Sequence, residues 1–246
     1  MSDTISIALV AEGVTDFEVL RAAVESMLDG QSFDMKLLQP EGSLAFTGAG
    51  HAGVLGGGWR GVYKWLLQAV ERSGGQLRND PLFNFYDILV IHLDADVARE
   101  DPANSRYSPI PELAGVLPCE VACFAGDPRP HETTNRLRQV LLSWMGEKEV
   151  PPRTAMCTPS KSTEAWVIAI FFPRDGQMIK LGWECHPDPE SRLAQQPKKV
   201  RFAKKQSDYA SRGIEMKEGW KRIVKRITEA KRFEDEFLAA VAEVTE

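Results

Sequence analysis

The segment ISIALVAEGVTD, residues 5–16, decides the fold class, because a largely apolar run passes directly into a turn and an acidic helix start. A run of this type is typical of a buried strand in a parallel sheet. The segment ILVIHLDAD, residues 88–96, repeats the arrangement and ends in two aspartates. Ligands bind at the carboxyl ends of strands in α/β sheets, so we expect the two acidic segments to meet at one place.

The rest of the chain alternates between strand and helix patterns. Strands are predicted at residues 5–11, 35–38, 87–93, 119–124 and 154–158, and helices at 15–28, 62–70, 134–145 and 163–172. Thr15 is the expected N-cap of the first helix. Residues 42–61, 97–118 and 173–197 lack a regular period and are interpreted as loops or linkers. The alternation predicts an α/β fold with a mostly parallel sheet and helices on both faces.

Length and composition suit one α/β domain with a small helical C-terminal appendage. The chain has 246 residues, of which 43% are hydrophobic. We assign residues 1–175 to the main domain and residues 176–246 to a linker and a basic helical appendage. No leader or membrane-spanning run is evident, so we expect a cytoplasmic protein. The four cysteines lack zinc-finger spacing, and Cys119 and Cys123 are interpreted as buried thiols.

Charge is unevenly distributed along the chain. Residues 1–190 carry 16 basic and 26 acidic side chains, whereas residues 191–246 carry 14 basic and 9 acidic ones. Phe202, Tyr209 and Trp220 lie among the cations, a pattern that suits phosphate neutralisation with base stacking. A solvated helix face docked on the acidic body is the alternative. The candidate nucleic-acid-binding residues are Lys198, Lys199, Arg201, Lys204, Lys205, Lys221, Arg222 and Lys225.

The acidic segments predict a site for a divalent cation. Asp94 and Asp96 both reach the crevice if the backbone turns after the strand, while Glu12 ends the neighbouring strand and Asp16 lies in the first turn of a helix. Oxygen ligands of this kind suit Mg²⁺ or Mn²⁺. Either segment alone is common without a ligand, and an Asp in a first helical turn is favourable for the helix dipole. Their occurrence at two strand ends favours a functional site.

Three motifs together resemble a known family. They are E-G-x-T-D after the first strand, D-x-D after the central strand, and KSTEAW at residues 161–166. The chain resembles, over about residues 4–172, the Toprim fold in the branch that contains the OLD-type nucleases and small Toprim-like proteins of bacterial defence loci. The resemblance implies a Toprim-like sheet and a metal-dependent nuclease.

The resemblance also implies residue roles. Glu12 would be the general acid/base or a metal ligand, and Asp94 and Asp96 would hold Mg²⁺. Asp16 and Glu164 would complete a two-metal site, with Lys161 near the phosphate. Two ions about 4 Å apart stabilise the attacking and leaving oxygens of a phosphodiester. The alternative for Lys161 and Glu164 is an ordinary helix start capped by residue 162 or 163.

Two further features remain open to different readings. The glycine-rich residues 42–61 lack the lysine of a P-loop, so they predict a lid or a plain loop, in which His51 would contact a substrate phosphate. His92 points to the same strand face as Asp94. It is interpreted as a core histidine, with support of a metal ligand as the alternative.

The sequence thus predicts a Toprim-type, Mg²⁺- or Mn²⁺-dependent endonuclease that acts on DNA or RNA. The resemblance suggests an anti-phage effector that is controlled by a separate ATPase partner, since the chain has no P-loop of its own. Other partners considered are nucleic acid and a second copy of the chain, and no membrane is expected. The alternatives are a non-catalytic Toprim-like sensing or scaffold module and a D-x-D nucleotide-sugar transferase, which would leave the segment around Glu12 unexplained.

Overall fold

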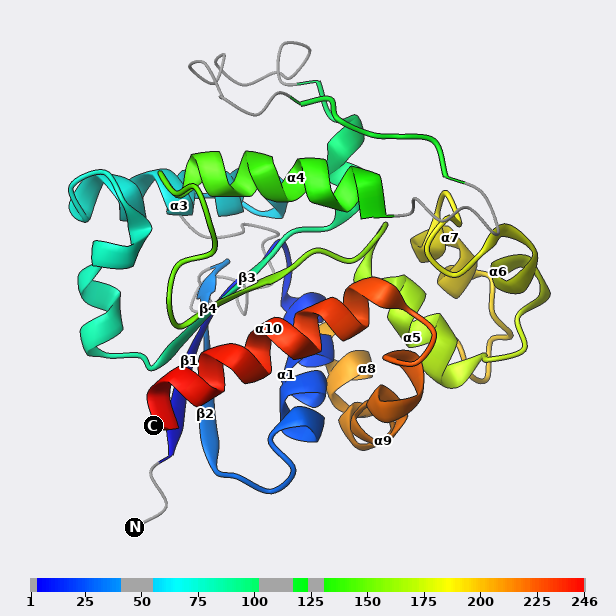
Figure 1. The fold of residues 1–246 in the computed structure, drawn as a ribbon. Coiled ribbons are helices and arrows are strands. Elements are labelled where there is room, and N and C mark those ends of the chain that lie inside the picture. Colours follow the sequence, from blue (N-terminus) through cyan, green and yellow to red (C-terminus); the bar gives the residue numbers. More distant parts are fainter. Residues whose placement is uncertain (1–3, 41–54, 102–116, 124–130, 246) are drawn as a thin grey trace.

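A four-stranded parallel sheet forms the centre of the protein (Figure 1). The computed structural model describes residues 4–40, 55–101, 117–123 and 131–245. The strands are β1 (Ile5–Val10), β2 (Phe33–Gln39), β3 (Ile88–His92) and β4 (Thr154–Cys157), in the order β2-β1-β3-β4. Every pairing among them is parallel. The predicted α/β class with a parallel sheet is therefore confirmed.

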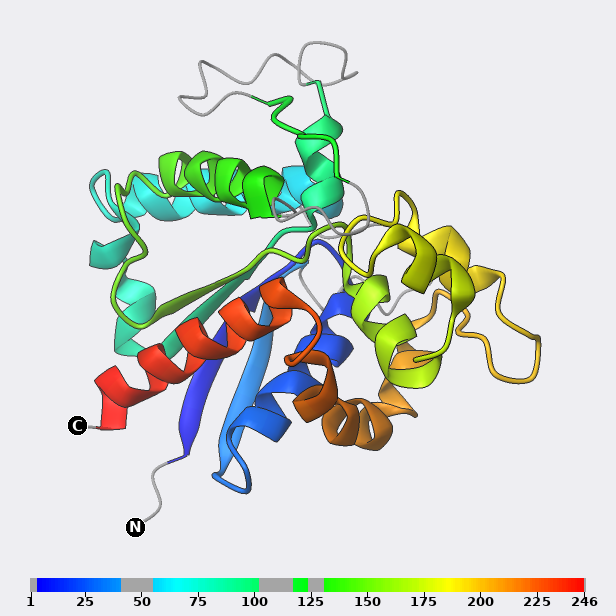
Figure 2. The ribbon, with the colours of Figure 1, turned by 45° about the vertical axis from the view of Figure 1, so that its right-hand side comes forward.

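Helices cover both faces of the sheet (Figures 1 and 2). One face packs against α1 (Val14–Met27), α5 (Thr163–Phe171), α9 (Gly213–Ile223) and α10 (Thr228–Thr245). The other packs against α3 (Gly58–Arg72) and α4 (His131–Trp144). Side chains alternate between the faces of a strand, so Ile88 and Val90 join the first core and Leu89 and Ile91 the second.

The predicted C-terminal helices share the core of the sheet. Trp220 in α9 and Phe233 in α10 contact Trp166 in α5, with ring centroids 5.4 and 6.4 Å away. In α10, Glu236 accepts a hydrogen bond from the backbone N–H of Met156 at 3.2 Å. This contact occupies a backbone donor on the edge strand β4, which would otherwise be open to pairing. The predicted C-terminal appendage therefore shares one hydrophobic core with the sheet, and its helices α9 and α10 lie on the same side of the sheet as α1 (Figure 2).

Several local predictions are wrong. Residues 119–123 form no strand, because Cys119 and Glu120 donate their N–H groups to Ala98 O and Val121 hydrogen bonds with the Thr133 side chain. Residues 58–61 belong to α3 instead of a loop. The N-cap of α1 is Gly13, which has an extended backbone, so Thr15 lies inside the helix. Residues 42–54, which include His51, and residues 102–116 and 124 of the predicted loops and strand lie outside the described residues.

The segment 173–197 is more regular than predicted. It contains the short helices α6 (Gly176–Leu181) and α7 (Pro189–Ala194). Asp175 and Asp188 accept backbone N–H groups at the starts of these helices and act as N-caps, the preferred role of Asp at a helix start. Other short elements of the described residues are η1 (Leu77–Asn79), η2 (Pro81–Asn84), η3 (Ala95–Arg99) and α8 (Gln206–Ala210).

Close packing between α5 and α9 predicts a sensitive glycine. A Cβ added at Gly219 would lie 2.5 Å from Ile170 Cγ2. We therefore expect Gly219→Ala to lower the free energy of unfolding by about 1–3 kcal/mol through overpacking, despite the better helix propensity of alanine. Urea unfolding measures the change. Gly213→Ala is the matched control, since its Cβ would meet only Arg21 Nη2 at 3.8 Å. Equal stability of the two variants would contradict the predicted close contact.

Candidate metal centre

The acidic residues predicted from sequence do meet at the carboxyl ends of β1 and β3. Glu12 follows β1 and its Oε1 accepts a hydrogen bond from the backbone N–H of Asp94 at 2.8 Å. Asp94 follows β3, and Asp96 is the second residue of η3. Asp16 is buried in the first turn of α1. The parallel pairing of β1 with β3 therefore places four carboxylates on one edge of the sheet.

A cavity of about 430 Å³ adjoins these carboxylates. Its walls include the starts of three helices, at Gly13 for α1, Gly58 for α3 and Ser162 for α5. Helix N-termini carry positive partial charge and exposed N–H groups, and they favour anions. The cavity therefore combines a carboxylate floor with the positive ends of three helices, in which the N–H groups of Gly58 and Thr163 are paired with Glu12 O and Asp94 Oδ1 at 3.0 and 3.2 Å.

Burial makes the carboxylates costly to ionise. At Glu12, burial and the negative charge of Asp94 raise the pKa well above the ordinary value. At Asp94, burial and the charges of Asp16 and Glu164 do the same for its pKa. Burial also raises the pKa of Asp96. A bound cation would offset this cost, because it attracts the deprotonated forms.

The donor atoms fit a divalent cation in two overlapping groups. Ligand atoms of Glu12, Asp94 and Asp96 lie within 4.8 Å of one another, and so do those of Asp16, His92 and Asp94. The first group offers oxygen ligands alone, whereas the second adds an imidazole nitrogen. These residues can hold a metal ion. Asp94 belongs to both groups and lies at the centre of the site.

Thr163 joins Asp16 to Asp94 at the start of α5. Its side-chain hydroxyl donates to Asp16 Oδ1 at 2.7 Å, and its backbone N–H donates to Asp94 Oδ1 at 3.2 Å. Glu164, the next residue, is buried and lines the cavity. Burial and the charge of Asp16 raise the pKa of Glu164. The structure therefore brings Glu164 to the predicted site, together with the four acids that follow β1 and β3 in the sequence.

Lys161 lines the cavity but has a partner that the sequence did not predict. Its Nζ lies 2.6 Å from Glu120 Oε1, which also accepts from Arg99 Nε at 2.8 Å. Burial alone would raise the pKa of Glu120, but the hydrogen bonds from Lys161 and Arg99 lower it. Neither Arg99 nor Glu120 is predicted from the sequence as a site residue. Arg99 follows the D-x-D motif closely and gave a weak signal, whereas nothing in the sequence links Glu120 to Lys161.

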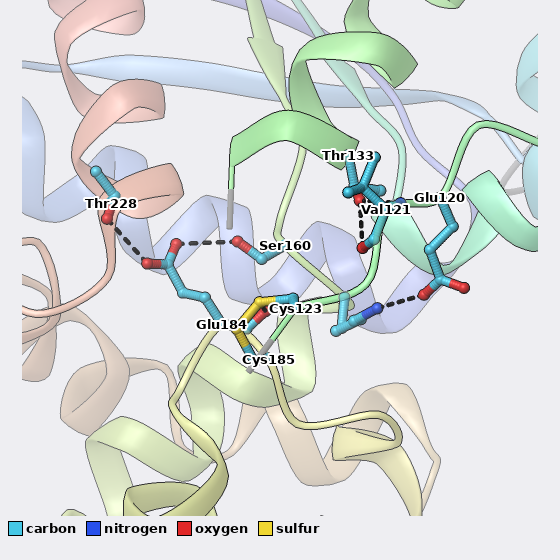
Figure 3. Close-up of a disulfide and its surroundings, with 9 residues drawn as sticks. Glu120, Val121, Cys123, Thr133, Ser160, Glu184, Cys185 and Thr228 are labelled. Carbon is cyan, nitrogen blue, oxygen red and sulfur yellow. Dashed lines mark hydrogen bonds and ion pairs between the residues drawn. A yellow bond between two sulfur atoms is a disulfide. The ribbon is translucent and has the colours of Figure 1, made fainter. Parts of the chain in front are cut away.

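A disulfide near this ion pair corrects the interpretation of the cysteines. Cys123 is bonded to Cys185, with a Cα–Cα distance of 5.2 Å, whereas Cys119 and Cys157 are free (Figure 3). The adjacent Glu184 accepts hydrogen bonds from Ser160 and from Thr228, both at 2.9 Å. Cys123 and Cys185 are 62 residues apart in the sequence, and their spacing alone does not identify them as a disulfide pair.

The predicted nucleic-acid-binding residues divide between two places. Lys204 lines the cavity and pairs with Glu190 at 2.7 Å. Lys198, Lys199, Arg201 and Lys205 are exposed in the connection between α7 and α8 that also carries Lys204. Lys221, Arg222 and Lys225 are exposed at the end of α9. α1 begins at the cavity and is about 20 Å long. Lys221 pairs with Asp29 at 3.8 Å just beyond the other end of this helix, so this second group lies away from the cavity.

The proposed stacking residues are not available for bases. Phe202, Tyr209 and Trp220 are 5%, 2% and 2% exposed and belong to the core. Phe202 packs against Tyr209, with ring centroids 5.0 Å apart, and Arg212 lies over the Phe202 ring. The prediction of base stacking by these residues is therefore wrong, because their aromatic faces are used for folding.

Comparison with known proteins adds no assignment: the chain matches no protein-family model, no curated protein and no solved structure. The site must therefore be interpreted from its own chemistry. Among the described residues, no helix combines the length and apolarity needed to cross a membrane.

The raised pKa of Glu12 predicts a trade-off between stability and metal binding. A carboxyl whose folded-state pKa is raised contributes stability below its unfolded pKa, and this contribution is lost as pH rises through the folded pKa. We expect Glu12→Gln, without divalent cations at pH 8, to raise the melting temperature by about 2–4 °C. The difference should vanish near pH 4.

Calorimetry with a chelator and with Mg²⁺ tests this prediction. Mg²⁺ should stabilise the wild-type protein more than the Glu12→Gln variant, because the amide no longer offers a charged ligand. Glu218→Gln, at an exposed position of α9, is the control and should leave both values unchanged. A lower melting temperature for Glu12→Gln in the chelator at pH 8 would refute the proposed cost of ionisation.

Proposed function

We propose that this protein is a divalent-metal-dependent phosphodiesterase of Toprim type that cleaves nucleic acid with Mg²⁺ or Mn²⁺. The observation that carries the proposal is the convergence of Glu12, Asp94 and Asp96 at a cavity whose walls include three helix starts. Carboxylate oxygens suit these cations, and helix N-termini suit a phosphate. The sequence motifs that resemble Toprim proteins contribute these same residues.

The residues of the chain have separate tasks in this proposal. Glu12, Asp94 and Asp96 would hold Mg²⁺ or Mn²⁺, with Asp16 and Glu164 as further ligands. The bound cation would supply Lewis acidity toward the phosphate. The resemblance also implies a general acid/base role for Glu12, whose Oε1 is held in place by the backbone N–H of Asp94 at 2.8 Å. Arg99 and Lys204 add positive charge to the cavity wall.

A non-catalytic Toprim-like module is the second candidate function. The observation that favours it is the 2.6 Å contact between Lys161 Nζ and Glu120, which occupies the ammonium group proposed to neutralise the phosphate. In this alternative the site binds a cation for structure or sensing. An anti-phage role, an ATPase partner, a homo-oligomeric state and a cytoplasmic location remain predictions from the sequence and the resemblance.

Cleavage of nucleic acid is the direct test. We expect the purified protein to nick or degrade plasmid DNA, or to cleave RNA, with Mn²⁺ or Mg²⁺ and not with a chelator. Asp96→Asn should reduce the rate at least about 100-fold, because a direct ligand matters more than a supporting contact, whose loss costs 10–100-fold. The control is again Glu218→Gln. A folded, metal-loaded protein that cleaves neither polymer would favour the non-catalytic module, and turnover of a sugar nucleotide would favour the transferase.

The exposed basic residues between α7 and α8 predict a salt-dependent interaction. We expect the triple variant Lys198→Glu, Lys199→Glu and Arg201→Glu to bind nucleic acid at least tenfold more weakly and to show a smaller salt slope, because fewer counterions are released. Fluorescence anisotropy at several salt concentrations measures both. Lys36→Glu with Lys148→Glu, two exposed positions in β2 and after α4, is the control. Equal weakening by both variants would indicate a non-specific charge effect.

A further inference from the structure

His92 is a buried imidazole with one satisfied and one unsatisfied nitrogen. The residue ends β3 and its side chain is 0% exposed. Its Nε2 lies 3.1 Å from Asp94 Oδ1, whereas its Nδ1 has no hydrogen-bond partner among the described residues. Buried polar atoms in folded proteins nearly always have a partner. We therefore expect His92 Nδ1 to bind a ligand.

The contacts around the ring indicate which nitrogen has the lone pair. Asp94 Oδ1 is an acceptor, since it also receives the backbone N–H of Thr163 at 3.2 Å. The proton of a neutral His92 therefore belongs on Nε2, where it is donated to Asp94. Nδ1 then carries the lone pair. A metal-binding histidine commonly donates its other ring N–H to a carboxylate, which orients the ring.

A second electron-rich atom lies near this nitrogen. Asp16 Oδ2 lies 3.9 Å from His92 Nδ1, a distance too long for a hydrogen bond. A transition-metal ion lies about 2.1 Å from a nitrogen or oxygen ligand. Because 3.9 Å is less than twice this length, one ion can contact both atoms. Asp16 Oδ1 is held by the Thr163 hydroxyl at 2.7 Å, so the other oxygen remains for the ion.

We propose that His92 Nδ1 and Asp16 Oδ2 bind a divalent transition-metal ion, with Asp94 orienting the imidazole. Nitrogen ligands favour transition metals over Mg²⁺ and Ca²⁺, which prefer oxygen. The ion position differs from the all-oxygen group of Glu12, Asp94 and Asp96. This inference rests on the proposed function to the extent that both use the same metal centre, and it makes that centre selective for Mn²⁺ over Mg²⁺.

Pulsed electron paramagnetic resonance of the Mn²⁺-loaded protein, without nucleic acid, tests the inference. A directly bonded histidine nitrogen modulates the Mn²⁺ signal, and labelling the histidines with ¹⁵N changes the modulation frequencies. We expect this change in the wild-type protein. Bound Mn²⁺ without nitrogen modulation would overturn the inference, whatever the variants show.

Variants assign the nitrogen to one residue. His92→Asn should abolish the modulation and weaken Mn²⁺ binding at this position at least about tenfold, with a smaller effect on Mg²⁺. Asp16→Asn should also abolish it and provides the result if His92→Asn does not fold. His131→Asn, at a histidine that pairs with Glu229 at 2.9 Å, is the control and should retain it. Retention of the modulation in folded His92→Asn or Asp16→Asn would refute the proposed ligands.

The binding and cleavage measurements separate the two proposals. Nitrogen modulation without cleavage of any nucleic acid would support the His92 site and reject the nuclease. Cleavage that requires Mn²⁺, in a protein whose bound Mn²⁺ lacks nitrogen modulation, would support the nuclease and reject His92 as a ligand.

Discussion

The parallel pairing of β1 with β3 is the constraint on which the candidate metal centre depends. Val10 pairs with Ile91, and Ser6 is held to Asp87 at the opposite end of the pair by hydrogen bonds of 2.6 and 2.8 Å. With this register, the Asp94 N–H reaches Glu12 at 2.8 Å. A slip of one residue would turn every side chain of one strand to the other face. The register of β1 with β3 therefore sets the positions of the candidate metal ligands that follow these strands.

The electrostatics of the site oppose folding without a cation and favour binding one. Burial raises the pKa of Glu12 and Asp94, so their deprotonated forms carry an energetic cost in the folded protein. Helix starts and the backbone N–H of Thr163 offset part of it. A site that keeps such carboxylates despite their cost is typical of function, since an apolar replacement would pack without this penalty.

The C-terminal segment combines a structural and an electrostatic role because its side chains alternate in environment. Trp220, Phe202 and Tyr209 are buried in the core, whereas the lysines and arginines beside them in sequence are mostly exposed. Aromatic residues among cations in a sequence can stack on bases or pack in the core, and the burial of their side chains decides between these two roles. Here the aromatic rings stabilise the fold, and under the proposed function only the exposed cations of this segment would meet a polyanion. Some of them, such as Lys204 and Lys221, are paired with carboxylates.

The sequence by itself determined the α/β class, the strands that Glu12 and Asp94 follow, and the helix that begins beside Glu164, because apolar periodicity and turn residues are local signals. It also identified five acids of the site. Only the tertiary structure decided the partners of Lys161 and His92 and the disulfide between Cys123 and Cys185. These contacts join residues from different segments or depend on ring orientation. Local sequence patterns carry no information on such distances, which the packing of the helices and loops around the sheet sets.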